Sequence, residues 1–292
     1  MVTGVQTCAL PISDFGGEGG IHGKAEDLYV EADGKRISLA GDWKYRIGLS
    51  LKGFPPAPVS PIQSSSYPTV LFNAMVKPWT AFPIKGVIWY QGEANVGRSE
   101  QYGDLFPALI TDWRRQWRSD FPFYFVQLAN FMESKKIQPN SEWAALREAQ
   151  TKALKLDQVG MAVTIDIGLA DDIHPKNKQE VGRRLALLAL AGSYGKNVSS
   201  SAPVFQNYII KGNKMELDFG QKQDGFQIKG TTLKGFTIAG PDRVFYPAEA
   251  MVHDGKIILS STEVPAPLAA RYGWADNPDC NLYGENGLPV AP

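Results

Sequence analysis

The stretch GVIWYQGEANVGRSEQYGDLFPALITDWRRQW, residues 86–117, decides the fold that the sequence predicts. Its first five residues, 86–90, are mostly apolar and either β-branched or aromatic, which is typical of a strand covered on both faces. After a polar turn, apolar residues recur at steps of three and four, which predicts an amphipathic helix. These residues are Tyr102, Leu105, Phe106, Leu109, Ile110, Trp113 and Trp117. Alternation of strand and helix is the mark of an α/β protein.

The same strand and helix pattern recurs twice further along the chain. Apolar runs predict strands at residues 123–128 (FYFVQL) and 161–167 (MAVTIDI). Ser141 can cap a helix between them, and Pro175 suits the first position of a helix that ends before Gly192. Such alternation predicts a parallel sheet with right-handed crossovers. Ligands bind at the carboxyl ends of the strands in such sheets, and polar clusters follow both residue 90 and residue 167.

The flanking regions differ from this α/β region, which we place at residues 69–200. Residues 28–47 alternate around Asp33 and Gly34, a strong hairpin signal. Residues 51–68 are rich in proline and serine and indicate a linker. Residues 201–292 contain short strands, one pair of them around Asp254 and Gly255, and predict a β module. Residues 1–13 lack the basic residues of a secretory signal and continue no pattern, so we expect them to be foreign to the fold.

Composition excludes several classes of protein. Thirty basic residues balance thirty acidic ones among 292, so charge favours neither nucleic acid nor an anionic membrane as a partner. No apolar run approaches the roughly 18 residues that span a bilayer. The two cysteines, Cys8 and Cys280, provide neither a disulfide framework nor a cysteine metal site. Glycine-rich phosphate loops are absent after the predicted strands, so no nucleotide cofactor is expected.

His174 is the candidate general base among three histidines. Asp171 and Asp172 precede it in the loop after the third predicted strand. A carboxylate there can hold the imidazole through Nδ1 and leave Nε2 to accept a proton. Equally, an aspartate could merely cap the following helix while His174 faces solvent. His22 and His253 are interpreted as surface residues.

A second polar cluster follows the first predicted strand and contains Gln91, Gly92, Glu93 and Asn95. An amide donor at a strand end can stabilise an oxyanion, an effect worth about 10²–10³ in rate. Taken alone, the cluster could be a polar turn that satisfies its own backbone.

A metal site is a further alternative for these loops, because carboxylate and imidazole groups ligate divalent ions. Their spacing matches no known metal motif, so no metal is expected. The side chains concerned are Glu93, Asp166, Asp171, Asp172 and His174.

Several long strings, in order along the chain, resemble the sialate O-acetylesterase family of the SGNH hydrolase superfamily. They are LFNAMVKP, the stretch from 84 to 117, FPFYFVQLANF, WAALREAQ, DDIHPKNKQEVGRRLAL and RYGWADNPDCNLYGENGLP. The resemblance implies a flavodoxin-like three-layer domain that removes O-acetyl groups from sialic acid or related sugars through a serine nucleophile, without a cofactor. A periplasmic or secreted location is plausible for the family. Residues 14–50 would be the remnant of a β insertion domain.

The resemblance also implies roles for single residues. His174 matches the catalytic base. Asp171 has the usual spacing of the acid, whereas Asp172 belongs to the DIHP string of bacterial members, so the two remain alternatives. Gln91 falls at the oxyanion amide, and Gly92, Glu93 and Asn95 shape its loop.

The strings GQSNM and SWGGT, which carry the family's nucleophile and a second oxyanion donor, occur nowhere in the sequence. Ser64, Ser65 and Ser66 lie in the predicted linker and not in a nucleophile elbow. We therefore expect the chain to be the C-terminal part of a longer esterase and to be inactive or nearly so, because losing a triad nucleophile costs about 10⁶ in kcat.

Two rival functions remain. A related esterase could act on acetylated xylan or another polysaccharide, because fold does not determine substrate. A non-catalytic carbohydrate-binding module is favoured by the seven tryptophans, although Trp113, Trp117 and Trp143 lie on helical stripes that are more typical of a core.

Overall fold

A computed structural model describes residues 24–27, 29–38, 40–41, 67–135, 137–221 and 225–292. The chain divides into two compact units, residues 1–64 and 65–292, and each is described by itself. Several predictions concern residues outside these described ranges. They are the predictions for residues 1–13, the linker up to residue 66, its three serines and His22.

The described part of the first unit is a short hairpin. Strands β1 (Tyr29–Ala32) and β2 (Lys35–Ser38) pair in antiparallel fashion after a 3₁₀ turn at Ala25–Asp27. Asp33 and Gly34 between them have φ values of 52° and 71°. Positive φ at both central residues is the geometry of a tight type I′ hairpin turn, which Asp-Gly favours. The predicted hairpin is confirmed.

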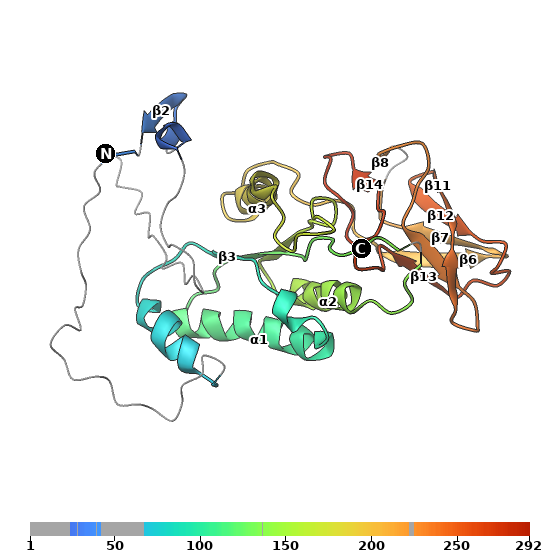
Figure 1. Ribbon diagram of the computed structural model, residues 1–292, viewed down its shortest axis with the longest axis horizontal. Helices are drawn as coiled ribbons and strands as arrows, with labels where there is room; N and C mark the ends of the chain where they lie inside the picture. The colour runs from blue at the N-terminus through green and yellow to red at the C-terminus, as the bar shows by residue number, and fades with distance from the viewer. Residues whose placement is uncertain (1–23, 28, 39, 42–66, 136, 222–224) are drawn as a thin grey trace. The chain divides into compact units, whose positions relative to one another are not determined.

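The second unit contains the predicted parallel sheet, with strand order β3-β4-β5. Its strands are β3 (Val87–Trp89), β4 (Phe123–Val126) and β5 (Val159–Ala162), and its helices are α1 (Ser99–Trp117), α2 (Glu142–Thr151) and α3 (Lys178–Gly192). In Figure 1, α1 and α2 lie on one side of the sheet and α3 on the other. This arrangement confirms the predicted class, a three-layer α/β domain with β-rich segments before and after it.

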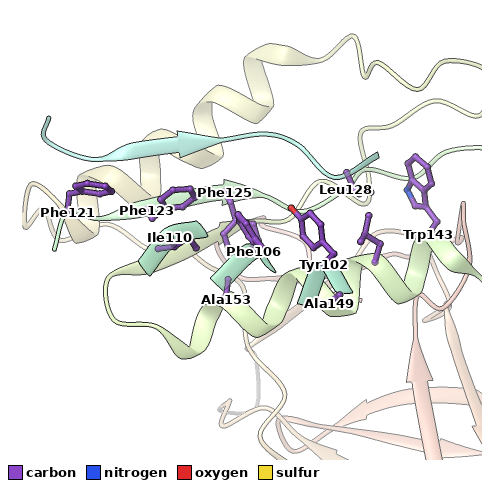
Figure 2. Packing of buried hydrophobic residues seen from close by; sticks show 11 residues of the cluster. Tyr102, Phe106, Ile110, Phe121, Phe123, Phe125, Leu128, Trp143, Ala149 and Ala153 are labelled. Atoms are coloured by element: carbon purple, nitrogen blue, oxygen red, sulfur yellow. The ribbon is translucent and has the colours of Figure 1, made fainter. Parts of the chain in front are cut away.

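The central strand β4 joins the two cores because its side chains alternate between the faces of the sheet. Phe123 and Phe125 pack with residues of α1 and α2, as Figure 2 shows. Tyr124 and Val126 pack against α3. Trp143 is 4% exposed in the first core, and Trp113 and Trp117 pack partly buried against it. The helical stripe therefore forms core as predicted, except that Leu105 is 53% exposed.

The third strand and the third helix differ from their predicted bounds. Strand β5 starts two residues earlier than predicted and ends at Ala162, while residues 164–167 form a turn in which the Ile167 amide donates to the Thr164 carbonyl. Within this turn, the Thr164 hydroxyl donates to the Gln127 carbonyl over 2.6 Å, and Asp166 pairs with Arg184. The predicted helix start at Pro175 is also wrong: α3 begins at Lys178, because the Asn177 side chain accepts from the Glu180 amide and caps it.

The C-terminal part of the second unit is built from short antiparallel strands. A four-stranded sheet has the order β11-β12-β7-β6, a three-stranded sheet the order β10-β9-β13, and β14 pairs with β8. A shared core joins the first two sheets through side chains of β7, β12 and β9. The strands are β6 (Asn207–Lys211), β7 (Lys214–Asp218), β8 (Phe226–Ile228), β9 (Phe236–Ala239), β10 (Phe245–Pro247), β11 (Glu249–His253), β12 (Lys256–Ser260), β13 (Ala269–Tyr272) and β14 (Leu282–Gly284).

Short helical turns complete the described chain. They comprise a π-helical turn at Phe72–Val76 and 3₁₀ turns at Lys77–Trp79, Glu93–Asn95 and Lys152–Lys155. Within the described ranges, none of the helices combines the length and the apolar character that crossing a bilayer requires.

Candidate active site

The loops that follow β3 and β5 meet in a cleft at the carboxyl edge of the parallel sheet. Its volume is about 370 Å³. Gln91 and Glu93 line it from the first loop and His174 from the second. The remaining lining residues are Tyr90, Ala94, Ile173, Pro175 and Lys178. The fold therefore brings together the two polar clusters that lie some 80 residues apart in the sequence.

The first loop is a tight polar turn built on the end of β3. Residues Glu93–Asn95 form a 3₁₀ turn, and the Gln91 amide donates from Nε2 to Asn95 Oδ1 over 2.7 Å. The backbone carbonyl of Gln91 accepts from the Tyr102 hydroxyl of α1 over 3.3 Å and from Gln150 Nε2 of α2 over 3.4 Å. An amide NH₂ has two hydrogens, so Gln91 can donate one to Asn95 and one into the cleft.

Gly92 lets this turn approach the helix behind it. Its φ of 157° and ψ of −26° lie in a region that residues with a β-carbon rarely adopt. A β-carbon there would also stand 3.2 Å from Gln150 Nε2 and 3.3 Å from Leu128 Cδ2. The backbone conformation therefore favours glycine at this position, and a β-carbon would also crowd the Gln150 and Leu128 side chains.

The second loop places His174 at the mouth of the cleft. Asp172 Oδ1 accepts from the backbone amide of His174 over 2.9 Å and lies 3.5 Å from its Nδ1. This carboxylate can therefore orient the imidazole with Nδ1 toward the loop. The His174 side chain is 85% exposed and that of Asp172 34% exposed, so solvent reaches the ring.

Asp171 and Asp172 occupy different positions. Asp171 is exposed, and within the described residues its carboxylate makes no hydrogen bond or ion pair, whereas Asp172 contacts His174 twice. The alternative interpretation, an aspartate that caps the third helix, is wrong, because Asn177 provides that cap. The same interpretation also expects His174 to face solvent, and the 85% exposure of the His174 side chain agrees with that part.

Charged side chains lie near Tyr90 in the cleft, and Tyr102 lies behind the first loop. Burial, and then the nearby Glu93 carboxylate, raise the pKa of Tyr90 to about 12. The Lys178 ammonium lies 5.1 Å from the centre of the Tyr90 ring, a cation–π distance. Burial is also the main reason that the pKa of Tyr102 is raised. Both phenols therefore stay neutral near pH 7 and can donate hydrogen bonds.

The oxygens of Asp166, one of the alternative metal ligands, bind protein groups. Arg184 donates to them from Nη1 over 2.6 Å and from Nη2 over 2.9 Å, and the Tyr283 hydroxyl donates over 3.2 Å. In the described part of the chain, no three His, Cys, Asp or Glu side chains are grouped so that they could hold a metal. Asp166 instead anchors the start of the loop that leads to His174.

Sequence reasoning missed Tyr90 and Lys178 as parts of the cleft. The sequence analysis places Tyr90 only at the end of a predicted strand and assigns no role to Lys178. A signal did exist for Tyr90, because a residue at the carboxyl end of a parallel strand borders the ligand edge. None existed for Lys178, because its place depends on where α3 begins.

Comparisons with known proteins agree with one another. A sequence model of the family described as "Carbohydrate esterase, sialic acid-specific acetylesterase" matches residues 59–191. Human sialate O-acetylesterase is 36% identical over 84% of this chain and 53% of its own length, and the mouse enzyme 31% identical over 77% and 46%. A crystal structure of a carbohydrate acetylesterase from Xanthomonas citri superposes with a TM-score of 0.72 at 45% identity, covering 77% of this chain and 53% of that one.

The chain spans about half the length of the curated relatives it matches. The family match covers the loop that contains Gln91 and the loop that contains His174, so the cleft lies within it. The family model, the relatives and the solved structure agree, so this chain is similar to the carbohydrate esterase family of sialic acid-specific acetylesterases, with the family match at residues 59–191.

Proposed function

We propose that this chain forms the base and oxyanion side of a carbohydrate O-acetylesterase active site, acting on O-acetylated sialic acid or related sugars. One observation carries the proposal: a single cleft contains Gln91 beside His174, and Asp172 lies at the Nδ1 side of that histidine. These are the groups that acyl transfer requires, namely an oxyanion donor, a general base and a carboxylate that orients the base.

In the proposed reaction a serine hydroxyl attacks the acetyl carbonyl carbon while His174 Nε2 takes its proton. The carbonyl oxygen becomes an oxyanion to which Gln91 donates from Nε2. The bond to the sugar oxygen then breaks, His174 returns the proton to that oxygen, and the acetyl group stays on the serine. Water, deprotonated by His174, then attacks the acetyl carbon of this ester. The bond to the serine oxygen breaks, His174 returns the proton to that oxygen, and acetate is released. No cofactor takes part.

We assign the orienting carboxylate to Asp172. Its contact with Nδ1 supports this choice over Asp171, whose carboxylate is not engaged with the ring. Asp172 also accepts from the backbone amide of His174, so a single side chain restrains both the loop and the imidazole.

The nucleophile in this proposal is a serine contributed by a segment that covers the exposed side of the cleft. The described residues that line it include no serine, threonine or cysteine. Among the strands that the structure describes, β3 lies at the edge of the parallel sheet beside the cleft, and its Ile88 is 68% exposed. An uncovered apolar side chain on an edge strand is the kind of surface that a further strand covers. By this proposal the chain alone is inactive.

The test measures acetate release from 9-O-acetyl sialic acid and from acetyl-xylan. The chain as given should release neither above background. The polypeptide with the sequence that its gene encodes upstream of residue 14 should release acetate, and His174→Gln in it should lower kcat by about 10³ or more. Asp172→Asn should have a large effect and Asp171→Asn a small one.

The two substrates separate the proposal from its rival. Cleavage of acetyl-xylan but not of 9-O-acetyl sialic acid would indicate a polysaccharide acetylesterase instead. If the longer polypeptide cleaves neither ester, or if the His174 variant keeps full activity, the proposal fails.

A further inference from the structure

The loop between β5 and α3 contains no helix or strand, yet it must hold His174 in place. Three contacts fix its middle to the segment 130–132, which follows β4. The Gly168 amide donates to Asn130 Oδ1 over 2.7 Å, the Met132 amide donates to the Ala170 carbonyl over 3.1 Å, and Phe131 forms a parallel bridge with Leu169. The segment 130–132 is therefore the support of the histidine loop.

Gly168 shows how close this contact is. A β-carbon built at Gly168 would overlap the carbonyl oxygen of Asn130, which is backbone and cannot turn aside. The histidine loop and its support are thus in direct main-chain contact. A displacement of Asn130 would move the loop as well.

The support is itself held by a segment near the C-terminus. The two halves of the Asn277 amide bond to it on either side of Phe131: Oδ1 accepts from Asn130 Nδ2 over 2.7 Å, and Nδ2 donates to the Met132 carbonyl over 2.7 Å. The Phe131 amide between them donates to the Asp276 carbonyl over 3.2 Å. Asn277 thus holds both ends of a three-residue support.

The segment that contains Asn277 is fixed in turn to helix α2. The Asp276 carboxylate accepts from the Ser141 hydroxyl over 2.6 Å and from Gln138 Nε2 over 2.5 Å. Arg147, which is 1% exposed, donates to the carbonyls of Gly273, Ala275 and Asp276. A buried arginine held by three carbonyls gives the segment a defined place relative to the sheet.

We propose that Asn277 is a positioning residue for His174, acting through Asn130 and residues 168–170. It touches neither the cleft nor the reacting groups. This inference rests on the proposed function for the role of His174. It assigns a function to part of the segment RYGWADNPDCNLYGENGLP, residues 271–289, that the cleft geometry alone leaves unexplained.

The first experiment measures hydrogen exchange of single amides in the chain as given. Asn277→Ala removes two hydrogen bonds and should speed exchange of the Gly168 and His174 amides by more than about fivefold relative to core amides of β4, because the loss of a single net hydrogen bond already corresponds to about that factor. Asn277→Asp keeps the acceptor for Asn130 but cannot donate to Met132, so its effect should be intermediate. It also serves as the second variant should the alanine protein not fold.

Asn286 provides a matched control. Its Nδ2 donates to Ser199 Oγ and to the Ser201 carbonyl, both over 2.7 Å, and its Oδ1 accepts from the Leu288 amide over 3.0 Å, so none of its hydrogen bonds goes to the histidine loop. Asn286→Ala should leave the two loop amides unchanged relative to the core. Equal effects of Asn277→Ala and Asn286→Ala on the loop would overturn the inference, because they would indicate general destabilisation.

The second experiment uses the longer polypeptide that the proposed function identifies as active. Asn277→Ala should lower kcat about tenfold or more and leave KM within about twofold, because a misplaced base impairs chemistry more than binding. A loosened loop with unchanged kcat would overturn the inference. The hydrogen-exchange experiment requires no catalysis. Failure of the proposed function would therefore leave its result unchanged, and the two failures can be told apart.

Discussion

Replacement of Arg184 by methionine tests how the histidine loop is anchored. The Arg184 and Asp166 side chains are 5% and 9% exposed, and two charge-assisted hydrogen bonds join them. Arg184 also donates to the Val163 carbonyl over 2.5 Å and to Glu180 over 2.7 Å. Methionine keeps most of the apolar stem, so the change removes the charge and four hydrogen bonds with little loss of volume.

The expected loss of unfolding free energy follows from the carboxylate that remains buried. Asp166 would stay buried with its charge unpaired, and breaking one partner of such a pair costs about 3–5 kcal/mol in the free energy of unfolding. Urea unfolding followed by tryptophan fluorescence would measure it. Arg183→Met is the matched control, because Arg183 lies next to Arg184 on α3 but is 48% exposed in its pair with Glu180. Exposed pairs contribute about 0–1 kcal/mol.

A double variant separates the unpaired charge from other effects. Asp166→Leu combined with Arg184→Met removes both charges, and it should be more stable than Arg184→Met alone, since the buried carboxylate is then gone. A loss below about 1 kcal/mol for Arg184→Met, or one no larger than that of Arg183→Met, would refute the reasoning.

Three further predictions concern the same unit. Gly92→Ala should lower the free energy of unfolding by about 1–3 kcal/mol, since it forces an unfavourable φ and crowds two side chains; urea unfolding checks this. Hydrogen bonds from Arg183 are the largest reason that the pKa of Glu180 is lowered to about 2, so its stabilisation should be present above pH 4.5 and be lost as pH falls toward 2. The difference in unfolding free energy between wild type and Glu180→Gln should shrink over that range, and a constant difference would contradict the prediction. Ser141→Ala removes both a helix cap and a donor to Asp276, and should cost about 1–3 kcal/mol by the same unfolding measurement, whereas no loss would show that water replaces both bonds.

Much of the fold could be predicted because its signals are local. The stripe from Tyr102 to Trp117 and the alternation around Asp33 and Gly34 each specify one element through side chains close together in the sequence. The three strands follow from short apolar runs, with the boundary errors typical of such runs. The strand predicted at residues 161–167 extends too far, because the apolar residues Ile165 and Ile167 lie in a turn and not in a strand.

The candidate site could be predicted in part for a topological reason. Once strands and helices alternate, the carboxyl ends of parallel strands share one edge, so Gln91 and His174 had to approach each other. The choice between Asp171 and Asp172 remained open, because the direction of a loop side chain depends on loop conformation and not on spacing.

By itself, therefore, the sequence determined the elements, their alternation and the edge at which the polar clusters meet, because these depend on periodicity and on chain topology. Only the tertiary structure decided which distant groups hold the loops. Asp166 binds Arg184 and Tyr283, and Asn277 binds the support of a loop more than 100 residues before it. Hydrogen bonds between remote side chains leave no local pattern, since each depends on where the whole fold places its donor and its acceptor.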